Sequence, residues 1–232
     1  MTKKTKLTRT GINALTSPFR WIIVTGIIYF IASGRIDILR AWLYIGVYIV
    51  GSLVSSLLLM KKVPELLNQR GKIQEGTKKW DKIVIVTYFL FAIVVTPLIA
   101  GLDYRFDIFP LPFNLVYIGL GLYVVSGVFS IWPMLYNPFF EGTVRIQKDK
   151  GHKVIETGPY SIVRHPGYLG MLLGSLPIPF AFGSVLSFMP VIIMVSLVFI
   201  RTYYEDKTLL IELEGYEEYS QKVRYRLIPL IW

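Results

Sequence analysis

The sequence contains no cysteine and only two histidines, His152 and His165. Without cysteine, the chain forms no disulfide, offers no thiolate nucleophile and gives no thiolate ligand to a metal. Two histidines alone do not make a zinc site. The chain also lacks a Gly-x-Gly-x-x-Gly segment and a Gly-x-Ser-x-Gly segment. These absences argue against a metal centre, a Rossmann dinucleotide domain and an α/β-hydrolase nucleophile elbow.

Charged side chains are absent from four long stretches. Residues 41–60, 83–102, 108–140 and 166–200 contain no Asp, Glu, Lys or Arg. About 20 mostly apolar residues are enough for a helix to cross the hydrocarbon core of a membrane. With 53% hydrophobic residues in the whole chain, the sequence predicts an all-α, polytopic membrane protein.

We expect about six transmembrane helices. The first four cover about 18–33, 38–60, 83–102 and 113–136. The first is the least apolar, and it is retained, because no clear small-residue cleavage site follows it. The run 166–200 would make a helix of roughly 52 Å, too long for one crossing. Pro177, Pro179, Gly183 and Ser184 interrupt it, which predicts a helical hairpin with two short legs.

The basic residues are distributed as in a membrane protein. All Lys and Arg except Arg35, Arg40 and Arg105 lie in the N-terminal segment, in loops 61–82 and 141–165, and in the tail 201–232. Six spans place these four segments on one side, which the positive-inside rule assigns to the cytoplasm together with both termini. The net charge of +10 therefore reflects topology rather than nucleic-acid binding. The tail is charged and predicted to be a cytoplasmic helix.

Two polar clusters flank the predicted hairpin. Residues 164–168 (Arg-His-Pro-Gly-Tyr) precede it, and the acidic pair Glu205-Asp206 follows it. Each has a simple alternative: the first as an anchor at the membrane interface, and the second as a solvated pair among the headgroups. A hairpin, however, brings both clusters to the same end, where a positive and a negative group would face one small cavity. Loop 147–155 is, by itself, typical of a solvated loop.

The motifs in this region resemble a family of integral membrane enzymes. They are Gly158-Pro159-Tyr160, the 164–168 block, and the tail pattern Arg201…Glu205-Asp206…Gly215-Tyr216…Tyr219…Val223…Pro229. Together they resemble the isoprenylcysteine carboxyl methyltransferase and phospholipid methyltransferase group. The resemblance covers about residues 137–232, which we expect to form the catalytic region, whereas residues 1–136 form the four N-terminal spans.

The resemblance implies S-adenosyl-L-methionine as cofactor and a lipophilic acceptor reached from the bilayer. It implies catalytic roles for Arg201, Glu205 and His165, with Arg201 near the acceptor. It implies a cofactor site made by Gln147, His152, Lys153, Val154, Ile155, Tyr160, His165, Pro166, Gly167, Tyr168 and Glu205. The chain departs from the family at Asp206, where a second glutamate is common, and in a longer spacing to Gly215.

The chemistry of these residue types suits this cofactor. A carboxylate such as Glu205 can pair with an amine or with ribose hydroxyls, and Arg164, His165 or backbone N–H groups can bind the cofactor carboxylate. Tyrosine rings can stack on adenine or lie near the sulfonium. The acceptor stays open: a carboxylate on a prenylated or similar molecule needs no base, whereas a phospholipid amine must lose a proton. Two other functions stay open, an NADPH-dependent reductase of the sterol or steroid type and a non-catalytic membrane module.

Overall fold

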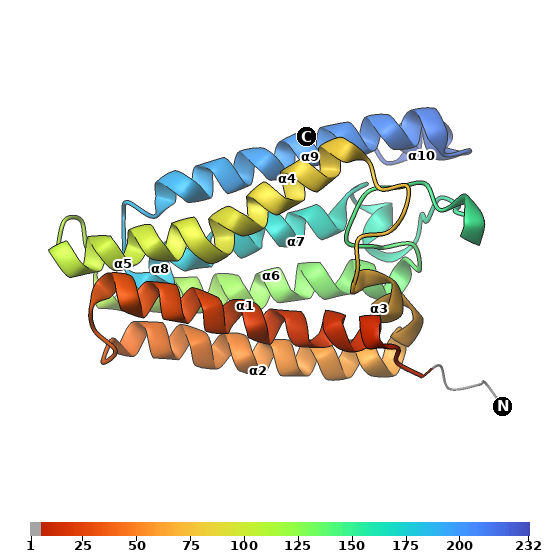
Figure 1. Cartoon of the computed structure of the whole chain (residues 1–232). Helices are drawn as coiled ribbons and strands as arrows, with labels where there is room; N and C mark the ends of the chain where they lie inside the picture. The colour runs from red at the N-terminus through yellow and green to blue at the C-terminus, as the bar shows by residue number, and fades with distance from the viewer. Residues whose placement is uncertain (1–5) are drawn as a thin grey trace.

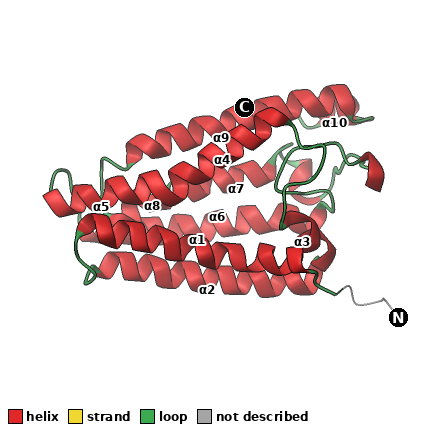
Figure 2. Ribbon diagram, viewed as in Figure 1, coloured by secondary structure: helices red, strands yellow, loops and turns green. Residues whose placement is uncertain are grey.

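The computed structural model describes residues 6–232 as helices joined by loops (Figure 2). Five helical segments are long and apolar enough to span a membrane. They are α1 (Arg9–Ser33), α2 (Leu39–Lys62), α4 to α5 (Lys79–Phe106), α6 with its preceding 3-10 turn (Phe113–Tyr136) and α9 (Phe188–Glu212). A sixth, shorter apolar pair consists of α7 (Pro166–Ser175) and α8 (Pro177–Phe182). The predicted all-α, polytopic membrane fold is confirmed.

Helix α1 begins earlier than predicted, inside the basic N-terminal segment. Its first residue is Arg9, and the hydroxyl of Thr8 caps the helix by accepting a hydrogen bond from the N–H of Gly11 at 3.4 Å. The N–H of Thr8 in turn donates to Asn68 at 2.8 Å. Asn68 belongs to α3 (Pro64–Arg70), so a surface helix fixes the start of the first span.

The hairpin differs from the prediction in its second leg. The first leg is short and breaks at Pro177, and α7 and α8 together rise about 25 Å at 1.5 Å per residue. The second leg, α9, is a long helix that continues past Arg201 to Glu212. The predicted tail helix is therefore wrong in extent. Residues 201–212 belong to α9, only α10 (Tyr216–Lys222) is separate, and the end of the chain returns along α9, where Trp232 contacts Phe199.

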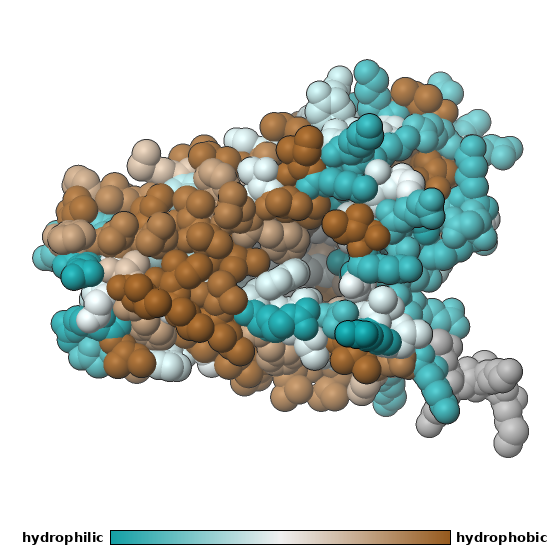
Figure 3. All heavy atoms as spheres, in the orientation of Figure 1, coloured by the Kyte–Doolittle hydropathy of each residue, from teal (hydrophilic) through white to brown (hydrophobic). Residues whose placement is uncertain are grey.

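All basic segments lie at one end of the bundle (Figure 1). The start of α1, helix α3, the loop between α6 and α7, and α10 gather there, whereas short connections join the helices at the opposite end. We call these the loop end and the turn end. Exposed apolar side chains such as Ile31, Ile83 and Tyr117 cover the outside between the two ends, where Figure 3 shows a wide hydrophobic surface. That the loop end faces the cytoplasm stays a prediction.

The segment from α4 (Lys79–Leu90) to α5 (Thr96–Phe106) contains a π-helical turn, η1 (Phe91–Val95). Pro97 follows it and has no N–H for the preceding turn, which is a common cause of such irregularities. The hydroxyl of Thr25 on α1 donates to the carbonyl of Ile93 at 3.5 Å. A neighbouring helix thus satisfies a carbonyl in the irregular turn, as membrane helices require.

Candidate active site

A cavity of about 190 Å³ lies at the loop end. Its walls come from the end of α6, the loop before α7, the start of α7, the second half of α9 and α10. The structure brings to this cavity every residue that the resemblance assigned to catalysis or to the cofactor site: Gln147, His152, Lys153, Val154, Ile155, Tyr160, His165, Pro166, Gly167, Tyr168, Arg201 and Glu205. Residues far apart in sequence therefore share one hollow, although their individual roles stay predictions.

The start of α7 explains the Pro-Gly pair of the motif. Pro166 occupies the first helical position, where its missing N–H costs nothing. Gly167 lies directly against Phe140, and a Cβ atom there would be 2.2 Å from the ring of Phe140. Only glycine permits this approach without a shift of the aromatic wall. His165 precedes the helix, and its ring stacks on that of Tyr168 at 5.7 Å.

The acidic pair separates into two environments. Glu205 lines the cavity, and one of its carboxylate oxygens accepts a hydrogen bond from the hydroxyl of Tyr168. Asp206 is 1% exposed and is not among the cavity residues. Neighbouring residues on a helix point about 100° apart, so the pair cannot serve one site together. The expectation that both acids face the cavity is therefore wrong for Asp206.

Asp206 is the centre of a buried polar network. It accepts hydrogen bonds from Arg164 at 2.8 and 2.9 Å, from Arg226 at 2.8 Å and from the hydroxyl of Tyr216 at 2.9 Å. The Nε2 atom of His165 lies 3.1 Å from the same carboxylate. This network joins α9 to the start of α7 and to the end of the chain.

Arg164 is committed to this network rather than to a ligand. Besides Asp206, it donates to the carbonyls of Ser220, Val223 and Arg224 at 2.9 to 3.3 Å. Burial opposes its charge, but the hydrogen bonds and attraction to Asp206 outweigh burial and raise the pKa of Arg164. The expectation that Arg164 could bind the cofactor carboxylate is therefore not favoured, because its donors already hold the tail.

Arg201 is fixed by an acid that sequence reasoning missed. Its guanidinium donates to the fully buried Asp81 of α4 at 2.6 and 3.2 Å and to the carbonyl of Gly142 at 2.9 Å. It also lies 4.8 Å from the ring centre of Tyr168. Asp81 in addition accepts the N–H of Val144 at 2.7 Å. The available signal was a lone carboxylate placed just before an uncharged run, a position where burial is costly without a partner.

Loop 137–155 is ordered by its own contacts and is not a freely solvated loop. Glu141, whose side chain is 1% exposed, accepts two hydrogen bonds from Arg145 at 2.8 and 2.9 Å. The side-chain amide of Gln147 donates to the carbonyl of Phe139 at 2.7 Å. The rings of Phe139 and His152 lie 4.7 Å apart. Together these contacts form an aromatic and polar wall for the cavity.

His152 is held as a neutral side chain. The backbone N–H of Gln147 donates to its Nδ1 atom at 3.3 Å, a bond that requires an unprotonated nitrogen. Burial lowers the pKa of His152; the positive charge of Arg145 also lowers it, and the negative charge of Glu141 raises it. The ring therefore offers the cavity an uncharged aromatic face at neutral pH.

A second, larger cavity of about 1000 Å³ lies between α1, α2, α4, α6, α7 and α9. It meets the first cavity, because both are lined by Arg70, Ser130, Met134, Gly142, Thr143, Met171 and Arg201. Arg70 donates to the carbonyl of Phe140 at 2.7 Å. Burial and the charge of Arg201 lower the pKa of Arg70 to about 10, which leaves it charged at neutral pH.

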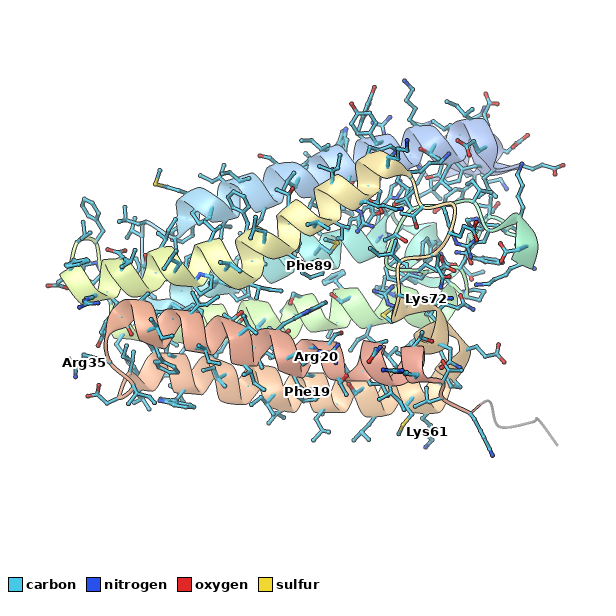
Figure 4. All side chains as sticks on the ribbon, viewed as in Figure 1. Phe19, Arg20, Arg35, Lys61, Lys72 and Phe89 are labelled. Atoms are coloured by element: carbon cyan, nitrogen blue, oxygen red, sulfur yellow. The ribbon has the colours of Figure 1, made fainter. Side chains whose placement is uncertain are left out.

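The charge in the larger cavity has one sign. Its charged lining residues in the described part of the chain are Arg20, Lys72, Arg70 and Arg201, with no aspartate or glutamate. Figure 4 places Arg20 on α1, Phe89 on α4 and Lys72 in the loop before α4, around the place where α1 and α4 diverge. Figure 3 shows a hollow in the surface there. The ring contact of Trp21 with Phe89 at 4.6 Å crosses between the helices.

Residues 119–211 match the family of isoprenylcysteine carboxyl methyltransferases (ICMT). A comparison with curated proteins found no match. The matched segment contains α7 and α9 up to residue 211, with the motif residues from Tyr160 to Glu205 that line the smaller cavity. The resemblance that the motifs indicated is thus confirmed, because the match supports an isoprenylcysteine carboxyl methyltransferase-like assignment of this segment, in a chain with five helices long and apolar enough to span a membrane.

Proposed function

We propose that the protein transfers a methyl group from S-adenosyl-L-methionine to the carboxylate of a lipophilic anion, at the cytoplasmic face of the membrane. The observation that carries this proposal is the shared wall of the two cavities. A small cavity with an available carboxylate meets a large cavity whose charged groups are all cations, and Arg70 and Arg201 lie at the junction.

The residues of the smaller cavity fit the cofactor by their chemistry. Glu205 has one carboxylate oxygen without a hydrogen bond to any described protein group, and it is suited to the cofactor ammonium or ribose hydroxyls. Lys153 lines the cavity and has no carboxylate partner within the described chain, so it is suited to the cofactor carboxylate. The faces of Phe139 and His152 provide a stacking surface for adenine.

The size of this cavity indicates that loop 137–155 moves on binding. Ligand sites commonly measure about 300–1,000 Å³, and this cavity is smaller, at about 190 Å³. The wall opposite α9 is a loop rather than a helix, and the hydrogen bonds of its residues 147–155 are made within the loop itself. We therefore expect the loop to shift outward as the cofactor enters and then to close over it.

When bound, the cofactor supplies an electrophilic methyl group on a sulfonium. The chain's residues then have to orient the acceptor and exclude water, since a carboxylate needs no base at neutral pH. Arg201 is suited to orienting the acceptor carboxylate, because Asp81 and the carbonyl of Gly142 fix its guanidinium at the junction. His165 acts through its contacts with Asp206 and Tyr168, which position the start of α7.

The cation-only lining distinguishes the two acceptor types. A carboxylate entering between α1 and α4 would meet Arg20 and Lys72 and then Arg70 and Arg201. The same cations would repel a phospholipid ammonium, and no acid in this lining offsets the repulsion. The arrangement thus favours a carboxylate over an amine.

The first test is cofactor binding, measured by calorimetry on the full chain in detergent. We expect binding of S-adenosylhomocysteine and no binding of NADPH. Glu205→Ala should weaken the binding of S-adenosylhomocysteine at least tenfold, or by about 1.4 kcal/mol, because a charge-assisted hydrogen bond is lost. Glu218→Ala, which changes an exposed carboxylate on α10, serves as control. Binding of NADPH alone would instead support the reductase reading.

The second test uses labelled S-adenosylmethionine with two acceptors. We expect the label on the carboxylate of a farnesylated cysteine and not on phosphatidylethanolamine. Label on the amine lipid alone would refute the carboxylate assignment while leaving methyl transfer in place.

A further inference from the structure

The interior of the larger cavity is lined by hydroxyl groups at membrane depth. Two facing helices, α2 and α6, contribute Tyr44, Tyr48, Ser52, Ser56, Tyr123 and Ser126. On α2 these residues recur at every fourth position, so they lie along one face of the helix. Most of the cavity is lined by apolar side chains, as pockets for apolar ligands are, so this row marks one place where the occupant can carry a polar atom.

The three tyrosines of this set form a cluster. The ring centres of Tyr48 and Tyr123 lie 5.1 Å apart, and those of Tyr44 and Tyr123 lie 5.9 Å apart. The hydroxyl of Tyr123 donates to the carbonyl of Tyr48 at 3.2 Å. The hydroxyls of Tyr44 and Tyr48 form no hydrogen bond with any protein group of the described chain, although Tyr44 is only 4% exposed. Both tyrosines line the cavity, so a polar group bound there can satisfy their hydroxyls.

The cluster has a defined distance from the junction of the cavities. Met134 of α6 lines both cavities, and the rise along α6 from Tyr123 to Met134 is about 16 Å. The rise along α2 from Tyr48 to Leu59 gives the same value of about 16 Å, and Leu59 packs in one cluster with Met134. An extended chain of roughly a dozen carbons covers this distance.

We propose that the acceptor is an oxygenated lipid carboxylate. This inference rests on the proposed function and specifies its substrate class. The carboxylate lies at Arg70 and Arg201, and a hydroxyl, carbonyl or ether oxygen about a dozen carbons along the chain hydrogen-bonds to Tyr44 and Tyr48. These two tyrosines therefore select for oxygen in the body of the lipid, whereas the arginines select for its charged end.

The test compares two probes that differ in one oxygen. They are stearic acid and stearic acid with a hydroxyl on its twelfth carbon, and calorimetry measures their binding to the full chain in detergent with S-adenosylhomocysteine present. We expect the wild type to bind the hydroxy acid about tenfold more tightly. The double variant Tyr44→Phe/Tyr48→Phe should bind both acids equally, because it lacks the two hydroxyls. Tyr117→Phe, which changes an exposed tyrosine on the same α6, should keep the wild-type preference.

Equal affinity of the wild type for the two acids would overturn the inference and would mean that the hydroxyls hold water only. A preference that survives in the double variant would overturn it as well, and so would failure of both acids to bind while S-adenosylhomocysteine binds. None of these results decides on methyl transfer itself, which the binding of S-adenosylhomocysteine and the labelling experiment test separately. The affinity for S-adenosylhomocysteine also verifies that each variant is folded. If the double variant is not folded, the single variants Tyr44→Phe and Tyr48→Phe replace it.

Discussion

The two ends of the helix bundle each bury an arginine, and they use it differently. At the turn end, Arg40 is 6% exposed and donates to the carbonyls of Leu111, Pro112 and Phe180 at 2.8 to 3.3 Å. Its Nε atom has no partner, and no carboxylate pairs with it in the described chain. At the loop end, Arg201 is paired with an acid and lies beside two cavities.

This difference shows that a buried charge alone does not mark a site. Arg40 is enclosed so tightly that a Cβ atom on Gly183 would be 1.7 Å from its guanidinium. It ties the start of α2 to the α5–α6 connection and to α8, so its bonds are structural. Arg201 has equally good partners, but the space next to it can admit a ligand. The cavity, and not the burial, makes Arg201 the candidate for function.

The largest expected effect comes from breaking the network around Asp206. Asp206→Ala leaves Arg164 and Arg226 without their carboxylate, and breaking a buried ion pair on one side costs about 3–5 kcal/mol. We expect a marked fall in the unfolding temperature and loss of S-adenosylhomocysteine binding. Thermal unfolding in detergent measures the first effect and calorimetry the second.

The neighbouring Glu205→Ala is the matched variant for this prediction. It removes a carboxylate from the cavity and not from the network, so it should weaken cofactor binding while leaving the unfolding temperature close to that of the wild type. Equal loss of stability in both variants would mean that the two acids are not separated as the structure has them.

The second prediction compares the arginines directly. Arg201→Met should lower kcat/KM by about 100-fold, because the acceptor is no longer oriented at the junction. Arg40→Met should lower the unfolding temperature, since three carbonyls lose their donor. It should leave kcat/KM per folded molecule unchanged. Methyl-transfer kinetics at saturating cofactor measure both.

A loss of activity in Arg40→Met without a loss of stability would contradict the structural role of the turn end. Asp81→Asn adds a control at the loop end. It keeps Arg201 but removes the charge that holds it, and it should reduce activity less than Arg201→Met does.

The sequence was sufficient to predict the parts of the fold that depend on composition and on the length of the uncharged runs. Uncharged runs gave the spans, and the Arg-His-Pro-Gly-Tyr block and Glu205 were placed at one end by the hairpin alone. Pro177, Pro179, Gly183 and Ser184 were sufficient to place the interruption of the hairpin.

Contacts between distant segments could not be predicted in the same way. Asp81 lies on α4, and nothing local indicates that its partner is Arg201. The length of α9 was also underestimated, because Arg201, Glu205 and Asp206 look like the end of a span. Their charges are instead compensated by other helices and by the tail, which lets the helix continue to Glu212.

The third prediction concerns the loop wall of the smaller cavity. S-adenosylhomocysteine should slow amide hydrogen exchange in residues 141–155 about tenfold, because the loop closes on the bound cofactor. The turn-end connection around Asp103 should not respond. The hydroxyl of Ser184 and the N–H of Phe109, at 2.8 Å, already satisfy that carboxylate, and the cavities do not reach it. Equal protection of both regions would point to global stabilisation instead of local closure.

The smallest expected effect is a pH dependence that originates from His152. Burial lowers its pKa in the folded state, so the unfolded chain, with an ordinary pKa of about 6.5, binds the proton first as the pH falls. The stability contributed by the neutral ring is complete above about pH 6.5 and is lost as the pH falls through the folded-state pKa. Protonation also removes the acceptor of the Gln147 N–H.

We therefore expect the difference in unfolding temperature between wild type and His152→Gln to shrink from pH 7.5 to pH 5, by no more than about 1 kcal/mol in stability. Lys153→Gln is the matched control, because it changes the next residue on the same wall and leaves the imidazole of His152 in place. His165 is present in all three proteins, so its contribution cancels in the comparison. A constant difference between wild type and His152→Gln would show that the ring is not held neutral. The hydrogen bond from the Gln147 N–H to the ring would then not order the loop that closes the cofactor cavity.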